Sequence, residues 1–209
     1  MRILVIRRGA IGDTVVTLPT LEILRRNYPD AYIEVIGNPN YWEIAQRRYY
    51  VDSVSKADAS IFSELYLKDG KISREASNYF SSFDLIIAYI SDPEEIVSNN
   101  LRKTGAKRVL SYLPFPKSND LHAADYTALV LKEIGLNVNP PLFPRIHMSG
   151  EVLDFATEFL SSSSGYKPLV AIHPRTFGIK AWPIEKFINI GKWIENSAWG
   201  KTIWITGQA

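Results

Sequence analysis

Short apolar runs alternate with longer segments of helical periodicity along most of the chain. Five runs rich in β-branched residues predict strands at 2–7, 32–36, 51–56, 83–90 and 108–111. Apolar residues at helical spacing predict helices at 14–28, 41–48, 58–82 (two short helices), 92–103 and 122–134. Pro19 is expected to kink the first helix or delay its start. The pattern predicts an open, largely parallel α/β sheet.

A proline-rich stretch, NVNPPLFP at 137–144, interrupts this alternation. Beyond it we expect a helix near 151–160 and then a new β-α-β unit with strands at 169–172 and 202–206 and a helix at 183–195. One such unit of roughly 45 residues cannot easily bury both faces of its sheet. We therefore predict an N-terminal domain at 1–140, a linker and helix at 141–166, and the incomplete start of a second domain at 167–209. The incomplete part is expected to be poorly protected or sheltered in a homodimer.

Composition narrows the classes of function. Of the 209 residues, 46% are hydrophobic and 22% are charged, which is typical of a globular protein. The net charge of +2 gives no reason to expect a nucleic-acid partner. The absence of cysteine excludes disulfides and thiolate chemistry, and the three scattered histidines argue against a metal site. With no apolar stretch long enough for a membrane span, we expect a soluble cytoplasmic protein.

The stretch RRGAIGDT at 7–14 follows the first predicted strand, where open α/β sheets place their ligands. It matches neither the dinucleotide fingerprint G-x-G-x-x-G nor a Walker phosphate loop. Asp13 can be interpreted as a helix N-cap, with Gly9 and Gly12 permitting the turn, or as a chemical group. Spacing alone favours the cap and leaves the second interpretation open.

The stretch HPRTFGIKAWP at 173–183 also lies between a predicted strand and a predicted helix. The hydroxyl of Thr176, the charges of Arg175 and Lys180 and the start of a helix together suit a diphosphate. A loop with solvated charges and with Trp182 packed at the helix start explains the same residues equally well.

In this order and separation the two stretches resemble glycosyltransferase family 9, the ADP-heptose:lipopolysaccharide heptosyltransferase group. The resemblance rests on Gly12-Asp13 through Pro19, on His173-Pro174 through Lys180-Ala181-Trp182-Pro183, and on the segment with His122, Asp125, Tyr126 and Leu129 before Ile134-Gly135-Leu136. It covers the whole chain and about the first 60% of a full-length member, so the second domain is expected to be truncated here.

The resemblance implies a GT-B-like fold, with a Rossmann-like N-terminal domain on the acceptor side and a nucleotide-sugar-binding C-terminal domain. It implies an inverting, metal-independent transfer, without a cofactor, of a heptose-like sugar from an ADP-sugar to lipopolysaccharide or another glycolipid. Peripheral contact with the cytoplasmic face of the inner membrane fits that acceptor. We expect the 209-residue chain itself to be inactive. The alternative is a non-catalytic module derived from this fold that binds a glycolipid or a protein partner.

The resemblance also implies roles for individual residues. Asp13 matches the base that takes the acceptor's proton. Lys180 matches the phosphate-contacting lysine, with Thr176, Arg175 and Gly12 as further residues of the donor side. Arg7 and Arg8 are expected to meet anionic groups of the acceptor, with at least one of them solvated or salt-bridged. Where the family often has Gly-Ala after His-Pro, this chain has the bulkier and more cationic Arg175-Thr176.

Overall fold

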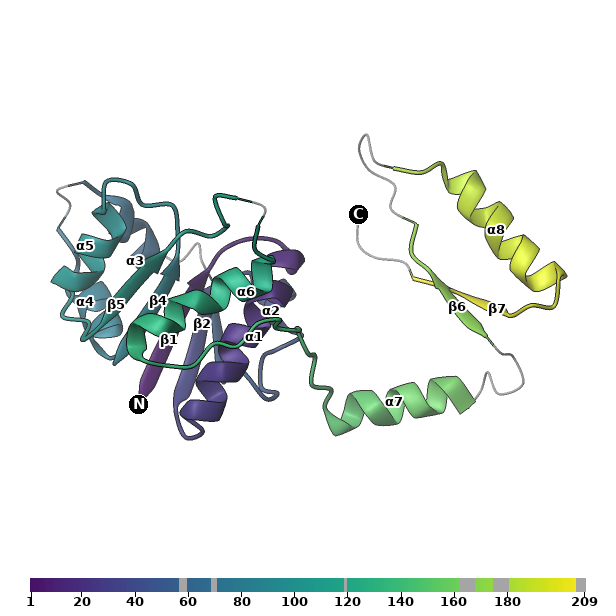
Figure 1. Cartoon of the computed structure of the whole chain (residues 1–209), viewed down its shortest axis with the longest axis horizontal. Coiled ribbons are helices and arrows are strands. Elements are labelled where there is room, and N and C mark those ends of the chain that lie inside the picture. The colour runs from purple at the N-terminus through teal and green to yellow at the C-terminus, as the bar shows by residue number, and fades with distance from the viewer. Residues whose placement is uncertain (57–59, 69–70, 119, 162–167, 175–180, 206–209) are drawn as a thin grey trace. The chain divides into compact units, whose positions relative to one another are not determined.

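The chain forms two compact units, Met1–Ser149 and Gly150–Ala209, in a computed structural model (Figure 1). The structure describes residues 1–56, 60–68, 71–118, 120–161, 168–174 and 181–205. Each unit is described by itself below.

The first unit is built on a parallel five-stranded sheet. Its strands are β1 (Arg2–Arg7), β2 (Tyr32–Gly37), β3 (Ser53–Lys56), β4 (Leu85–Tyr89) and β5 (Val109–Tyr112). They lie in the order β3-β2-β1-β4-β5, and every pairing is parallel. The chain builds outward from β1 first on one side and then on the other, so the strand order reverses between β1 and β4. Open sheets of this kind bind ligands at the carboxyl edge near that reversal.

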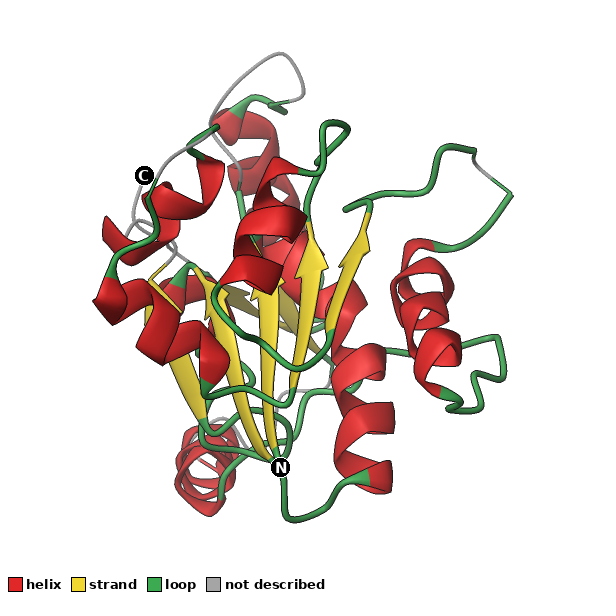
Figure 2. Ribbon diagram, turned by 90° about the vertical axis from the view of Figure 1, so that its left-hand side faces the viewer, coloured by secondary structure: helices red, strands yellow, loops and turns green. Residues whose placement is uncertain are grey.

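Helices cover both faces of this sheet (Figure 2). In chain order they are α1 (Ile11–Asn27), α2 (Pro39–Trp42), α3 (Ser60–Ser63), the 3-10 helix η1 (Glu64–Tyr66), α4 (Arg74–Ser81), α5 (Ile96–Lys103), α6 (Ala123–Ala128) and the 3-10 helix η2 (Leu129–Ile134). Alternate side chains of β1 enter different cores, as the two-residue period of a strand requires. Ile3 and Val5 join the core that includes α1 and α6, whereas Leu4 and Ile6 join the core formed with α3, α4 and α5. The prediction of a parallel α/β sheet is confirmed.

Helix α1 begins at Ile11, three residues before the predicted start at Thr14, and continues through Pro19. A proline inside a helix cannot donate to the carbonyl four residues earlier. Here the proline is buried, and one turn of the helix is tied to a neighbour, because the hydroxyl of Thr127 donates to the carbonyl of Val16 at 2.8 Å. Because Pro19 does not delay the helix, its first turn begins four residues after the end of β1, where the candidate site lies.

Two predicted helices are interrupted. The helix expected at 41–48 ends at Trp42, because the chain then turns back: Arg47 has a φ of +52° and its N–H donates to the carbonyl of Val51 at 2.7 Å. The helix expected at 122–134 is regular only to Ala128 and continues as η2. It ends at Gly135, as predicted, with a φ of +80° that favours glycine.

Arg145 and His147, which follow the predicted domain end at 140, pack within the first unit. The hydroxyl of Tyr50 donates to the carbonyl of Arg145 at 3.0 Å, and Nη1 of Arg48 donates to the carbonyl of His147 at 3.3 Å. The side chain of His147 lies against the rings of Tyr49 and Tyr50. The predicted linker began at residue 141, but the first unit continues to Ser149.

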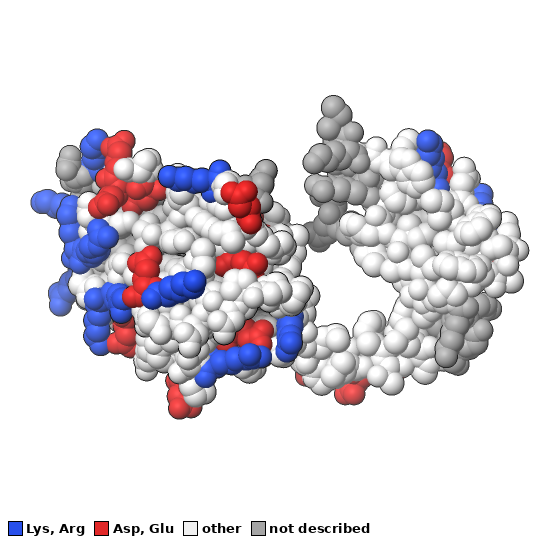
Figure 3. Space-filling view, in the orientation of Figure 1, with Lys and Arg blue, Asp and Glu red and all other residues white. Residues whose placement is uncertain are grey.

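The second unit contains helix α7 (Gly150–Ser161) and a β-α-β unit formed by β6 (Leu169–Ile172), α8 (Ile184–Asn196) and β7 (Lys201–Trp204). The two strands pair in parallel, and Gly191 of α8 lets the helix approach β7 closely: a Cβ added there would lie 2.6 Å from the ring of Trp204. In the space-filling view the first unit shows interspersed charges, whereas the visible face of the second unit shows few (Figure 3). Its exposed side chains include Phe155, Phe159, Ile188, Trp193 and Trp199.

Candidate active site at the carboxyl edge of the sheet

Asp13 lies in the first turn of α1, directly above the carboxyl end of β1. Its Oδ2 accepts a hydrogen bond from the backbone N–H of Ala10 at 2.8 Å, and its Oδ1 accepts one from Nη2 of Arg7 at 2.9 Å. The carboxylate thus caps the helix from its third position, and it also forms an ion pair. The side chain is 16% exposed, so a ligand hydroxyl can reach it.

Arg7 is the last residue of β1, and its side chain is 0% exposed. Besides Asp13, it bonds the carbonyl of Pro114 through Nη1 at 2.7 Å. Its guanidinium carbon lies 5.3 Å from the ring centroids of both Tyr89 and Phe115. In the sheet Arg7 pairs with Tyr89 of β4, which places the guanidinium at the reversal of strand order.

The electrostatics of this cluster follow from its burial. Desolvation lowers the pKa of the Arg7 guanidinium, and the neighbouring charge of Asp13 opposes that shift. Burial likewise raises the pKa of Tyr89, whose hydroxyl donates to the carbonyl of Thr127 at 2.6 Å. Burial also raises the pKa of Tyr126. The tyrosines therefore remain neutral.

Gly9 brings the backbone against this carboxylate. It has a φ of +149°, and a Cβ built on it would lie 2.3 Å from Oδ2 of Asp13. A side chain at this position would therefore displace Asp13 and strain the turn. The sequence suggested only that Gly9 permits the turn. The structure shows that its lack of a side chain also leaves room for the Asp13 carboxylate.

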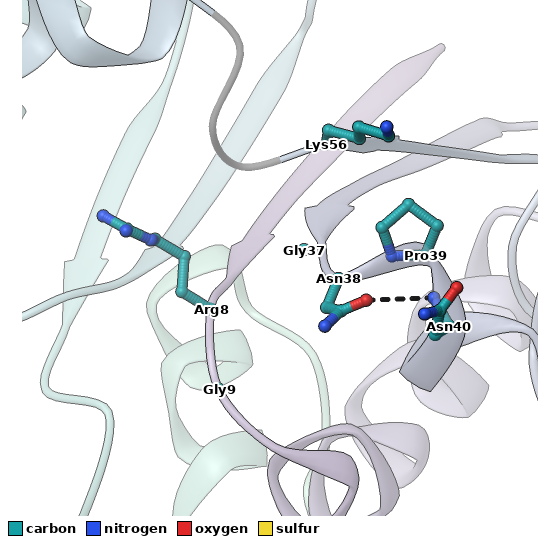
Figure 4. Close-up of a pocket in the computed structure, with 7 residues that line it drawn as sticks. All are labelled: Arg8, Gly9, Gly37, Asn38, Pro39, Asn40 and Lys56. Atoms are coloured by element: carbon teal, nitrogen blue, oxygen red, sulfur yellow. Dashed lines mark hydrogen bonds between the residues drawn. The ribbon is translucent and has the colours of Figure 1, made fainter. Parts of the chain in front are cut away.

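A pocket of about 420 Å³ adjoins Gly9 at the ends of β1, β2 and β3 (Figure 4). It is lined by Arg8, Gly9, Gly37, Asn38, Pro39, Asn40 and Lys56. Oδ1 of Asn38 accepts from the N–H of Asn40 at 3.1 Å, while Arg8 and Lys56 lie on opposite sides. The side chain of Arg8 extends away from Asn38 and reaches the hydroxyl of Tyr66 at 3.3 Å. Both cations are exposed, so this part of the edge is open and positive.

The predicted site residues divide into three groups. Asp13, Arg7 and Arg8 come together at the carboxyl edge, but Arg7 is buried and bonded to Asp13 and not open to an acceptor. Gly12 is exposed, with no atom within 4 Å of an added Cβ, so a ligand can approach its backbone. The predicted donor-side residues Arg175, Thr176 and Lys180 lie outside the described residues. Trp182 packs edge-on against Phe187 at 4.9 Å, as expected of a side chain at the start of a helix.

Sequence reasoning missed Tyr89, Pro114 and Phe115 around Arg7, and Lys56 in the pocket. Position offered a signal for two of them, because Tyr89 and Lys56 end strands whose carboxyl ends share one edge. Pro114 and Phe115 belong to a loop, and no local pattern connects them with Arg7.

Two further features bear on the class of site. Within the described ranges, no three His, Asp or Glu side chains gather as a metal site would require. Of the helices that the structure describes, none is both long enough and apolar enough to traverse a bilayer.

Known structures resemble this chain over nearly its whole length. A glycosyltransferase family 9 protein from Veillonella parvula DSM 2008 matches 97% of the chain at 21% identity with a TM-score of 0.68. E. coli heptosyltransferase WaaC with ADP matches 100% at 17% identity and a TM-score of 0.61. E. coli ADP-heptose lps heptosyltransferase II matches 98% at 16% identity and a TM-score of 0.62.

These likenesses concern the fold, and they come from structures alone. No family model matches the sequence, and no curated protein matches it either. The chain spans 62% of the length of the Veillonella protein and 69% of that of WaaC. The predicted fold class is confirmed: this chain has the α/β fold of the GT-B glycosyltransferases of family 9, over the part of their length that it spans.

Proposed function

We propose that this chain comprises the acceptor side and the start of the donor side of an inverting glycosyltransferase in which Asp13 is the catalytic base. The observation that carries the proposal is the carboxylate itself. It is held by Arg7 and by the N–H of Ala10, yet it stays partly exposed at the carboxyl edge of the sheet. A general base needs both a defined orientation and access to the proton that it removes.

In the proposed reaction an acceptor hydroxyl attacks the anomeric carbon of a nucleotide-sugar. Asp13 takes the hydroxyl proton as the new C–O bond forms, and the bond between the anomeric carbon and the phosphate oxygen breaks with its electron pair on the diphosphate. Attack from the opposite face inverts the anomeric configuration. In a metal-independent reaction, cations and N–H donors stabilise the leaving diphosphate, and Lys180, Arg175, Thr176 and Gly12 are proposed for that role.

The proposed donor is an ADP-sugar, with ADP-heptose as the first candidate, and the proposed acceptor is lipopolysaccharide or a related glycolipid. Support for the donor comes from the similar E. coli protein, whose structures contain ADP and ADP-2-deoxy-2-fluoro heptose. Support for an anionic acceptor comes from the pocket that adjoins Gly9, where Arg8 and Lys56 provide positive charge. An acceptor of this kind would bring the protein to the cytoplasmic face of the inner membrane.

The test is a transfer assay with the full-length protein. It is incubated with heptose-free lipopolysaccharide and either ADP-heptose or UDP-glucose, with and without EDTA, and the product's anomeric configuration is determined by NMR. We expect transfer from ADP-heptose alone, unaffected by EDTA, with inversion. A retained configuration or inhibition by EDTA would contradict the mechanism. Binding of the glycolipid without any transfer would favour the non-catalytic module instead.

A further inference from the structure

The guanidinium of Arg7 connects parts of the chain that are far apart in sequence. One Nη bonds Asp13 on α1, and the other bonds the carbonyl of Pro114 in the loop after β5. Tyr89 of β4 and Phe115 of the same loop place their rings next to its charged carbon. A guanidinium can form two directed bonds at once because its donors lie in one rigid plane. Its orientation therefore depends on β4 and on the 114–115 loop.

Asp13 receives its orientation from two directions. Arg7 occupies one lone pair of Oδ1, and the N–H of Ala10 occupies one lone pair of Oδ2. With both oxygens bonded, rotation of the carboxylate about its χ2 angle would break both contacts. Each oxygen keeps one lone pair for a substrate hydroxyl. The N–H of Ala10 alone would leave the carboxylate free to pivot about that single bond.

Stability does not explain why arginine occupies this position. Its Nε is buried and has no hydrogen-bond partner among the described residues. Burial also lowers the pKa of the guanidinium despite the neighbouring carboxylate. A buried charge with an unpaired donor is less favourable than an apolar side chain of similar size. A residue that the fold keeps against its own stability points to a role in the site.

We propose that Arg7 is a positioning residue that holds the Asp13 carboxylate in its reactive orientation, with Pro114 and Phe115 holding Arg7 in turn. The inference rests on the proposed role of Asp13 as the base. It assigns Arg7 to the base and not to the acceptor, and it makes the 114–115 loop part of the catalytic apparatus. Phe115 is 57% exposed, so a ligand that contacts its ring can act on the guanidinium behind it.

The experiment compares Arg7→Met and Arg7→Lys with the wild type in the full-length protein. Met fills the same space without charge or donors, and Lys restores a charge that can reach Asp13 but cannot form the planar pair of bonds. We expect Arg7→Met to lower kcat by roughly 10–100-fold while the KM for the donor changes by less than about 3-fold, because misorientation affects the chemical step. Arg7→Lys should recover a substantial part of kcat. The melting temperature of Arg7→Met should stay within about 3 °C of the wild type.

Arg25→Met is the matched control. Arg25 lies at the other end of α1 and pairs with Asp52 at 2.7 Å, so its removal should lower the melting temperature and leave kcat unchanged. Phe115→Leu provides a second variant at an exposed position, and it should lower kcat less than Arg7→Met does. Wild-type kcat in Arg7→Met, or no difference between the Met and Lys variants, would overturn the proposal.

A crystal structure of Arg7→Met gives a readout that needs no activity. We expect the Asp13 carboxylate to rotate away from Ala10 or to occupy two conformers. An unmoved, single conformer would overturn the inference even if the enzyme is active. Conversely, a moved carboxylate in a protein that transfers no sugar would refute the proposed function and leave the positioning of Asp13 by Arg7 supported.

Discussion

Helix α1 contributes one residue to an arginine–aspartate pair at each of its ends, and the two pairs differ in how completely they are hydrogen-bonded. At the amino edge of the sheet, Arg25 pairs with Asp52 at 2.7 Å and also donates to the carbonyls of Tyr49, Pro29, Ala31 and Tyr50. Asp52 additionally accepts from the N–H of Ile33 at 2.7 Å. At the carboxyl edge, the hydrogen bonds of Arg7 within the described part of the chain go only to Asp13 and to the carbonyl of Pro114, and its Nε has no acceptor there.

The difference separates a structural pair from a functional one. The pair at the amino edge satisfies its donors and joins α1 to the starts of β2 and β3, which is what a pair that supports the fold should do. The pair at the carboxyl edge is more buried on its cationic side and less well satisfied, and it lies at the reversal of strand order. The same two residue types therefore have different roles according to the edge on which they lie.

Replacing the two aspartates by asparagine should have the largest and most different effects on turnover. Asp13→Asn removes the proposed base, so turnover should fall on the order of 10²–10⁴-fold. Asp52→Asn should leave turnover unchanged and lower the free energy of unfolding by about 1–2 kcal/mol, because two hydrogen bonds lose their charged acceptor. Steady-state kinetics and urea unfolding of the full-length protein check both expectations.

Stability alone cannot distinguish these two variants. Asp13→Asn leaves the buried Arg7 without a negative partner, so it too should lower the free energy of unfolding, by about 1–3 kcal/mol. Turnover is therefore measured on protein shown to be folded by circular dichroism. Turnover of Asp13→Asn within about 3-fold of the wild type would eliminate Asp13 as the base.

Two glycines beside Asp13 give a sharper test of its position. A Cβ at Gly9 would lie 2.3 Å from Oδ2 of Asp13, whereas a Cβ at Gly12 would meet nothing within 4 Å. Gly9→Ala should reduce turnover by roughly 10–100-fold, since a displaced carboxylate no longer meets the acceptor hydroxyl. Gly12→Ala lies inside α1 and should stabilise it by about 0.5–1 kcal/mol.

The Gly12→Ala variant also tests the donor side of the proposed site. If Gly12 approaches a phosphate, as its resemblance to the family implies, Gly12→Ala should raise the KM for the donor without changing kcat. Equal turnover in the wild type and Gly9→Ala would show that the carboxylate tolerates displacement, and it would remove the main geometric argument for Asp13.

The fold was largely predictable from local pattern because the central strands of the sheet each have their own apolar run in the sequence. The runs that became β1, β2 and β4 are apolar over almost their whole length, and Gly135 ends its helix as its backbone freedom suggests. The helix expected at 41–48 failed for a reason that no local pattern contains. Trp42 is buried and the chain turns back through a bridge between Gln46 and Val51, so tertiary contacts decide where α2 ends.

The site was predictable only in part. The sequence suggested Asp13 as the N-cap, but Ala10 holds that position and Asp13 lies three residues further on, at N3, where its carboxylate accepts from the N–H of Ala10. Pro114 is 107 residues from Arg7, and nothing in the sequence connects them. Ile3, Val5 and Arg7 share the two-residue period of β1, so Arg7 continues the positions that face the core with α1 and α6. Leu4 and Ile6 are buried on the other face, so the period alone does not distinguish Arg7 from Arg8. A salt bridge was expected for at least one of the two arginines, and Arg7 forms one, but its burial was not predicted.

The smallest effect is expected at a third carboxylate, Asp84, which lies at the amino edge with the structural pair. Its pKa is lowered by a hydrogen bond from the side chain of Lys107 and by one from the N–H of Arg2. A carboxyl whose pKa falls on folding stabilises the protein above its ordinary pKa of 3.8, and that contribution is lost as the pH falls through the lower value. Asp84→Asn should therefore be less stable than the wild type at pH 7, and the difference should shrink below about pH 4.

Urea unfolding at pH 7, 5, 4 and 3 measures this difference, and turnover at pH 7 should be the same in both proteins. The partly exposed position of Asp84 keeps the effect small, because solvent screens such pairs. A difference in stability that persists unchanged at pH 3 would show that the charge of Asp84 is not what stabilises this edge. Loss of turnover in Asp84→Asn would contradict the assignment of the amino edge to stability alone, because a carboxylate there would then affect catalysis.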